Sequence, residues 1–159
     1  MRKINAKNVT ENEVWSPKKT MGGWGRDLSI ALGRDPKSTD LLERHPFDVE
    51  IQRYPMGKPG YPYHAHSAQW EFYYVLSGEG FVRDAEGRTR VEAGDFFLFK
   101  PGEAHQLMGG EREDLVVMCV ADNPIGETCY YPDSKKNSVY QPAREFIRGE
   151  SLDYFDGEE

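Results

Sequence analysis

Three of the four histidines in this 159-residue chain have a type and spacing that could form one chemical site. His64 and His66 are two residues apart, so both imidazoles point to the same face if this segment is a β-strand. Glu71 lies five residues after His66, which reverses the parity. A bend or bulge near residues 67–68 would return its carboxylate to the side of the histidines, because bulges redirect side chains beside functional sites.

His105 follows the turn at residues 101–104, across a hairpin and a further strand, and could approach this pair from a neighbouring strand. Three neutral imidazoles and one carboxylate suit a divalent transition metal, although such ligands do not identify the ion among Fe, Mn, Zn and Ni. They leave about two positions of an octahedral shell open, which distinguishes a catalytic site from a closed structural one. We therefore expect one metal ion, held by His64, His66, Glu71 and His105.

Short β-strands must position these residues, because the sequence between residues 47 and 121 is rich in β-branched and aromatic residues and is divided by Gly/Pro turns. A hairpin is predicted by two short runs that flank the turn at residues 84–87. Many short strands without a long helical pattern predict an all-β sandwich or barrel. The expected strands are 47–51, 70–76, 80–83, 88–91, 96–99 and 115–120.

Two of these strands have informative faces. Residues 47–51 alternate between apolar and acidic side chains, as a half-buried strand does, and Arg53 continues the apolar face. We expect Arg53 to end the strand at solvent rather than to meet an anionic substrate inside the barrel. Strand 70–76 is apolar on both faces, so one face can line the barrel while the other needs a cover. The candidates are the N-terminal segment, with Trp15 and Trp24, and a second subunit; we expect both, with a symmetric homodimer.

The motifs that contain the four candidate ligands resemble the two sequence motifs of the cupin superfamily. The first runs from the turn at 57–60 through His64, His66 and Glu71 to Gly78, and the second from Gly94 through residues 101–102 to His105. The resemblance implies a double-stranded β-helix, a small jelly-roll barrel, with a metal at the matching positions His64, His66, Glu71 and His105. The sequence departs from the family pattern at Lys58 and Gly109, and these positions affect turns and the lining of the pocket rather than the metal ligands. Segments near both ends are similar to a group of uncharacterised, conserved, single-domain bacterial cupins. This similarity does not indicate a reaction.

The expected organisation has three parts. Residues 1–45 form an irregular N-terminal extension that packs on the barrel, 46–125 form the cupin barrel core, and 126–159 form an irregular C-terminal extension with an acidic tail. Within the first part, residues 28–32 could be an edge strand, and residues 40–44 are at most one helical turn.

Composition excludes several classes of protein. There are 20 basic against 27 acidic residues, a net charge of −7 and no Lys/Arg block, so we expect no nucleic-acid partner. No apolar run is long enough to span a membrane, and the first residues lack the apolar stretch of a secretory signal, so we expect a cytoplasmic protein. Cys119 and Cys129 are then expected to be free thiols.

Our first functional hypothesis is a metal-dependent enzyme that acts on a small polar metabolite in the barrel. Iron would favour dioxygenation, whereas Mn, Zn or Ni would favour isomerisation or decarboxylation. Sugar-phosphate isomerases occur among cupins, but the negative net charge does not favour a phosphorylated substrate. A non-catalytic barrel that binds or senses a small ligand is the alternative, and a metal-free structural barrel is a third hypothesis. Nearby residues that could line the pocket are Tyr61, Tyr63, Gln69, Gln106 and Met108, the two tyrosines being equally compatible with packing at the barrel rim.

Overall fold

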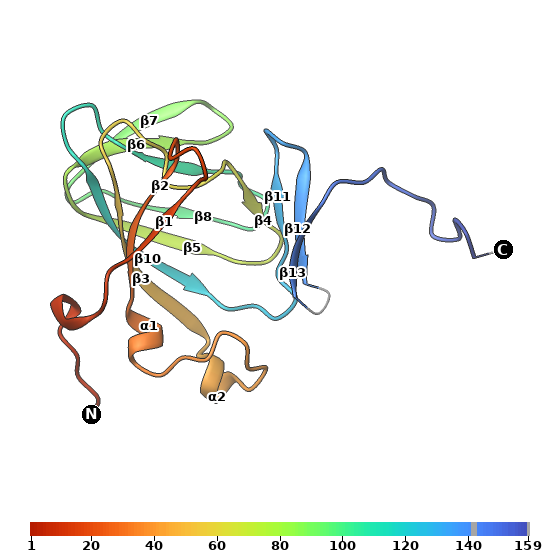
Figure 1. The fold of residues 1–159 in the computed structure, drawn as a ribbon, viewed down its shortest axis with the longest axis horizontal. Helices are drawn as coiled ribbons and strands as arrows, with labels where there is room; N and C mark the ends of the chain where they lie inside the picture. Colours follow the sequence, from red (N-terminus) through yellow and green to blue (C-terminus); the bar gives the residue numbers. More distant parts are fainter. Residues whose placement is uncertain (141–142, 159) are drawn as a thin grey trace.

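The architecture consists almost entirely of antiparallel β-strands (Figure 1). The computed structural model describes residues 1–140 and 143–158, so residues 141, 142 and 159 of the expected C-terminal extension lie outside it. No helix in the described ranges is long and apolar enough to cross a membrane. The elements are a 3₁₀-helix Ala6–Asn8, β1 Asn12–Trp15, β2 Gly22–Asp27, α1 Leu28–Ala31, α2 Leu41–Arg44, β3 Phe47–Tyr54, β4 Ala65–His66, β5 Glu71–Ser77, β6 Glu79–Arg83, β7 Arg88–Glu92, β8 Phe96–Phe99, β9 Gln106–Gly109, β10 Leu115–Asp122, β11 Cys129–Tyr131, β12 Lys136–Tyr140 and β13 Arg144–Ile147.

Three sheets enclose the interior, and the barrel predicted from the strand pattern is confirmed. The largest has the order β1-β2-β3-β10-β5-β8, and the other two have the orders β7-β6-β9 and β13-β12-β11-β4. The hairpin predicted around residues 84–87 is the β6–β7 pair. After β13 the chain extends away from the body of the molecule (Figure 1).

The hydrophobic core lies between these sheets. Tyr73 and Val75 of β5 are 2 % and 0 % exposed, and they meet Val117 of β10 and Leu107 of β9, both fully buried. Burial of each aliphatic side chain of this size stabilises the fold by roughly 1.5–3 kcal/mol. The inner face of strand 70–76 is therefore the one that carries Tyr73 and Val75.

Strand β3 points its polar residues inward. In the register with β10, Glu50 lies opposite Cys119 and Gln52 lies opposite Val117, and both of these β10 residues are buried. The apolar face that begins with Phe47 is therefore the outer face. Arg53 lies on this outer face as well, in agreement with the expectation that it does not enter the barrel.

The N-terminal segment is more regular than the sequence suggests. β1 and β2 form a hairpin that extends the large sheet beside β3. Residues 28–32 are expected as an edge strand, but Leu28–Ala31 form the helical turn α1 instead, because the Asp27 carboxylate accepts a hydrogen bond from the backbone N–H of Ile30. The single helical turn expected at residues 40–44 is α2.

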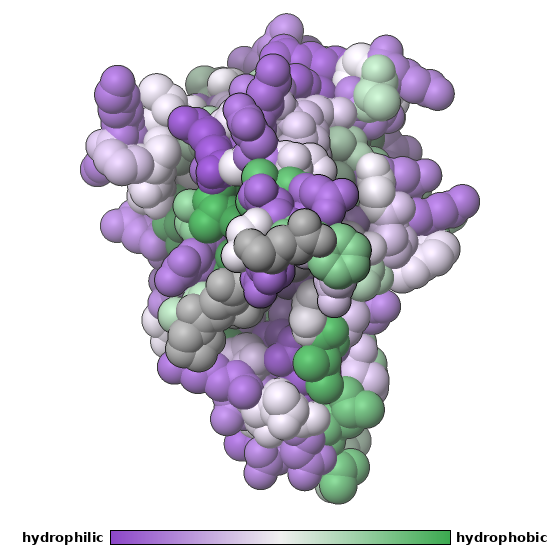
Figure 2. Space-filling model, turned by 90° about the vertical axis from the view of Figure 1, so that its right-hand side faces the viewer, coloured by the Kyte–Doolittle hydropathy of each residue, from purple (hydrophilic) through white to green (hydrophobic). Residues whose placement is uncertain are grey.

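The outer face of β5 and β8 remains uncovered in the described residues. The large hydrophobic side chains exposed on this face or just before β5 are between 38 % and 69 % exposed, and they are Trp70, Tyr74, Leu76, Phe96 and Leu98. β1 and β2 lie on the far side of β3, so they lengthen the sheet and do not cover this face. By contrast, the side of the molecule that carries the C-terminal strands is mostly hydrophilic, with small separate hydrophobic patches (Figure 2).

We expect a second copy of the chain to cover the outer face of β5 and β8, because a symmetric contact buries the same apolar patch on both copies. In analytical ultracentrifugation, the wild-type protein should sediment at about twice the 18.2 kDa mass of one chain. The Phe96→Glu/Leu98→Glu variant should sediment as a single chain. Phe146→Glu, which alters an exposed phenylalanine on β13, is the control and should leave the mass unchanged. A wild-type protein that sediments as one chain would contradict the expected homodimer.

Candidate metal centre

His64 and His105 form a cross-strand pair. The backbone N–H of His64 donates to the carbonyl of His105 at 3.1 Å, and the N–H of His105 donates back at 2.8 Å. Paired residues on adjacent antiparallel strands place their side chains on the same face. The two imidazole ring centroids are 4.9 Å apart, so residues from the two separate sequence motifs meet directly.

His66 and Glu71 complete the cluster. The expected change of direction after His66 is a loop at residues 67–70 that joins β4 to β5, and not a bulge within one strand. Oε2 of Glu71 lies 3.5 Å from Nε2 of His66 and 2.7 Å from Nε2 of His105. Nε2 of His64 lies 3.0 Å from Nε2 of His66. The structure therefore brings all four predicted residues together.

The outer nitrogens of the three imidazoles fix their tautomers. Nδ1 of His64 lies 3.0 Å from the carbonyl of Pro62, and Nδ1 of His105 lies 3.1 Å from the carbonyl of Glu103. A carbonyl oxygen only accepts hydrogen bonds, so both Nδ1 atoms carry the proton. Nδ1 of His66 lies 3.2 Å from a carboxylate oxygen, which favours the same tautomer. With the outer nitrogens held in this way, Nε2 of His64 faces Nε2 of His66, and Nε2 of His105 faces Oε2 of Glu71.

Such a donor set fits a divalent transition metal. His105 is 1 % exposed, and its Nε2 has no hydrogen-bond partner among the described residues, although Oε2 of Glu71 lies 2.7 Å away. A buried, unpartnered nitrogen costs about 1–3 kcal/mol. Ligand atoms of His64, His66 and Glu71 all lie within 4.8 Å of one another, close enough to share one ion. Imidazole nitrogen and carboxylate oxygen are ligands that Zn, Fe, Ni and Mn accept.

The electrostatics of the cluster also favour one positive charge at its centre. Burial and the neighbouring His105 and His66 lower the pKa of His64 to about 3, so this ring is neutral. Burial acts in the same direction on His66, but its hydrogen bond with Cys129 and the charges of Glu71 and Glu127 outweigh it and raise the pKa to about 9. His66 therefore holds a proton that it can share with the lone pair of His64. A metal ion would replace that proton, since ligand histidines bind metal in the neutral form.

Glu127 holds His66 in place, although sequence reasoning did not select it. One oxygen accepts from Nδ1 of His66, and the carboxylate also accepts from the backbone N–H groups of residues 67–69 at 2.8, 2.9 and 2.9 Å. A carboxylate behind a ligand histidine fixes the ring and raises its basicity. Glu127 lies between β10 and β11, 56 residues after Glu71, and no local motif connects the two. The same carboxylate thus shapes the loop that leads to Glu71.

Aromatic rings restrain the imidazoles from the sides. The Phe99 ring stacks on His105 with centroids 4.0 Å apart and an angle of 4° between the planes. Tyr131 of β11 stacks on His64 at 5.8 Å, and Tyr61 meets the same imidazole edge-on at 5.1 Å. These contacts leave the rings little freedom to rotate, so the cluster is preorganised.

The five residues expected to line the pocket have different positions. Gln69 lines a cavity of about 130 Å³ together with Glu71, and Tyr61 contacts His64 as described. The other three contact neighbours of their own: Tyr63 lies under the Arg83 guanidinium, Gln106 donates to the carbonyl of Tyr61, and Met108 pairs with Phe81 and Pro59. The cavity also has walls that sequence reasoning did not select, namely Asp48, Glu50, Gln52, Cys119 and Ala121.

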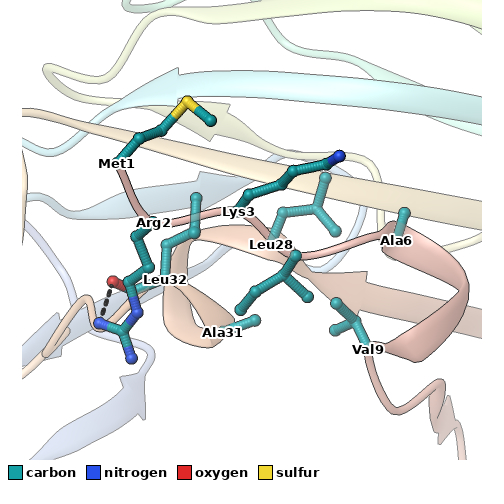
Figure 3. Close-up of a pocket in the computed structure, with 9 residues that line it drawn as sticks. Met1, Arg2, Lys3, Ala6, Val9, Leu28, Ala31 and Leu32 are labelled. Carbon is teal, nitrogen blue, oxygen red and sulfur yellow. Dashed lines mark hydrogen bonds between the residues drawn. The ribbon is translucent and has the colours of Figure 1, made fainter.

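The structure has a second possible metal-binding group and a second hollow. Cys129 and Glu127 form a second possible metal-binding group with His66, but they face its Nδ1 and not its Nε2. A larger hollow of about 360 Å³ lies between the N-terminal segment and α1 (Figure 3). Its lining is mostly apolar, and Arg2 donates to the carbonyl of Leu32 at 2.7 Å, so it lacks the converging polar groups of the histidine cluster.

Comparisons with known proteins concern the family and the fold of the chain. The cupin domain family model matches residues 50–121. The oxalate-binding protein of Thermotoga maritima is 33 % identical over 57 residues, which are 36 % of this chain and 47 % of that protein. The chain thus matches about half the length of this curated relative.

Two solved structures share the fold over nearly their whole length. A sugar phosphate isomerase from Silicibacter pomeroyi superimposes with a TM-score of 0.79 at 22 % identity, covering 96 % of this chain and 98 % of that one. A candidate sugar phosphate isomerase from Acidithiobacillus ferrooxidans gives a TM-score of 0.74 at 19 % identity and covers 92 % of each chain. At these identities the likeness concerns the fold.

Glu127→Gln should weaken metal binding by about 10- to 100-fold, because the ring of His66 loses its charged partner while the amide retains one acceptor for the loop. Competition against a chromophoric chelator measures the affinity. Glu145→Gln on β13 removes the same charge from the same part of the chain at an exposed position, and it should bind metal like the wild type. Equal affinities of the two variants would contradict the role of Glu127.

Proposed function

Because this chain belongs to the cupin superfamily, we propose that it is a metal-dependent enzyme that acts on a small polar metabolite inside its barrel. The observation that carries the proposal is the buried cluster of three imidazole Nε2 atoms and one carboxylate oxygen. Four ligands leave about two coordination positions for a substrate. A purely structural role would not require open positions.

The side chains of the centre have separate tasks. His64, His66, His105 and Glu71 would hold the ion, and a divalent metal bound there would act as a Lewis acid on substrate oxygens. Tyr73 donates a hydrogen bond to Oε2 of Glu71 at 3.3 Å and so orients the carboxylate. Isomerisation, decarboxylation and dioxygenation are the reaction classes that this arrangement supports. The names of the two structural relatives favour isomerisation among them.

One observation favours a second candidate, a non-catalytic barrel that binds a small ligand. The curated relative is named an oxalate-binding protein, which is a statement about binding and not about turnover. In this case the same four residues would anchor a ligand through the metal. Turnover distinguishes the two candidates: the metal-loaded protein is incubated with hydroxyketones, hydroxy acids, diketones and catechols. Conversion above the rate without protein supports the enzyme, whereas a thermal shift without conversion supports the binder.

The metal content of the purified protein tests the centre itself. We expect about one equivalent of Fe, Mn, Zn or Ni per chain in the wild type, and a loss of at least about tenfold in affinity in His66→Ala, because each ligand contributes directly to binding. His45→Ala is the matched control, since it removes the one histidine outside the cluster. Elemental analysis and chelator competition give the two values. Unchanged metal content in His66→Ala would exclude the proposed site.

A further inference from the structure

A polar chamber adjoins the candidate metal centre, and the inward face of β3 builds one of its walls. Asp48, Glu50 and Gln52 line this cavity of about 130 Å³, and Glu71 belongs both to the cavity and to the metal cluster. The alternating pattern of β3 would ordinarily place its apolar residues inside. The strand does the reverse, which is the kind of local conflict that proteins keep at functional sites.

The negative charges of the carboxylates in the chamber are neutralised by neighbouring cations to different degrees. Arg34 pairs with Asp48 at 3.0 Å, whereas no Lys, Arg or His of residues 1–140 and 143–158 forms an ion pair with Glu50. Glu50 accepts one hydrogen bond, from Nε2 of Gln52 at 2.7 Å. Asp27, which lies opposite Glu50 in the register of β2 and β3, adds another negative charge. The wall is therefore net negative even with Arg34 in place.

Free hydrogen-bond acceptors remain in this wall. Oδ1 of Asp48 is buried and has no hydrogen-bond partner among the described residues. One N–H of each amide is already used, because Gln69 donates to the carbonyl of Asp122 and Gln52 donates to Glu50 while it accepts from Tyr54. Burial and the neighbouring Asp48 raise the pKa of Glu50 to about 7, so its carboxyl group can accept or donate a proton near neutrality. The chamber thus offers acceptors to a ligand that brings donors.

We propose that this polar chamber is the substrate-binding pocket of the candidate metal centre and that it selects a small uncharged molecule with several hydroxyl groups. The inference rests on the proposed function, because Glu71 connects the chamber to the metal. Hydroxyl groups donate to Asp48 and Glu50 and still present oxygen atoms to a metal. A phosphate or dicarboxylate would instead face Asp48 and Glu50, with the charge of Asp27 close to both, and like charges in a confined space repel strongly. A cationic ligand would face the metal ion on the Glu71 side.

Binding of matched probes to the metal-loaded full chain tests the inference. Isothermal titration calorimetry compares dihydroxyacetone with its phosphate, with oxalate and with the cationic 2-amino-1,3-propanediol. We expect dihydroxyacetone to bind at least about tenfold more tightly than each charged probe, as expected when hydrogen bonds to charged acceptors decide affinity. Tighter binding of oxalate, the phosphate or the amine would overturn the proposal.

Variants of the wall separate this inference from the metal centre. Glu50→Gln keeps the shape of the side chain and should weaken dihydroxyacetone binding by about tenfold or more. The Asp48→Asn/Glu50→Gln variant should also bind oxalate more tightly than the wild type, an effect that a merely structural role does not produce. Glu86→Gln in the exposed β6–β7 turn is the control for the loss of one charge. Unchanged binding in Glu50→Gln overturns the inference. Metal content, measured in every variant, stays at the wild-type value, and its absence from the wild type would instead contradict the proposed function.

Discussion

Three imidazole nitrogens and a carboxylate oxygen lie close together in a buried space: Nε2 of His64 is 3.0 Å from Nε2 of His66, and Oε2 of Glu71 is 3.5 Å from His66 and 2.7 Å from His105. Such an arrangement is repulsive unless a positive charge occupies the centre. The surroundings prevent the rings from turning away, because Pro62, Glu103 and Glu127 bind the outer nitrogens. The barrel therefore keeps a cation-binding centre in place whether a proton or a metal ion provides the charge.

The interior has an apolar part and a polar part, and they serve different purposes. Val75, Leu107 and Val117 form a core that fixes the sheets relative to one another. The inward carboxyl group of Glu50 reduces that stability, because burying a charge without a cationic partner is unfavourable. A fold can tolerate this cost beside a ligand site, where the polar groups recognise the ligand.

Much of this architecture follows from the sequence alone. The strand pattern predicts a sandwich or barrel, and the spacing of the histidines indicates that they could meet. The resemblance to the cupin motifs adds the jelly-roll barrel and the full set of ligands. Alternation in β3 could not show which face points inward, because a period of two is the same from either side. Glu127 was missed because its partnership with His66 depends on how β11 returns to β4, which no local pattern encodes. The helical turn α1 was missed because one capping carboxylate outweighs a weak alternation.

X-ray absorption of the protein loaded with one equivalent of zinc tests the central claim most directly, because it reports the atoms around the ion. We predict three imidazoles and at least one oxygen at about 2.0–2.2 Å and no sulfur. A sulfur neighbour at about 2.3 Å would place the ion at Cys129, on the opposite side of His66, and would contradict the account. A shell with one imidazole or none would contradict it equally.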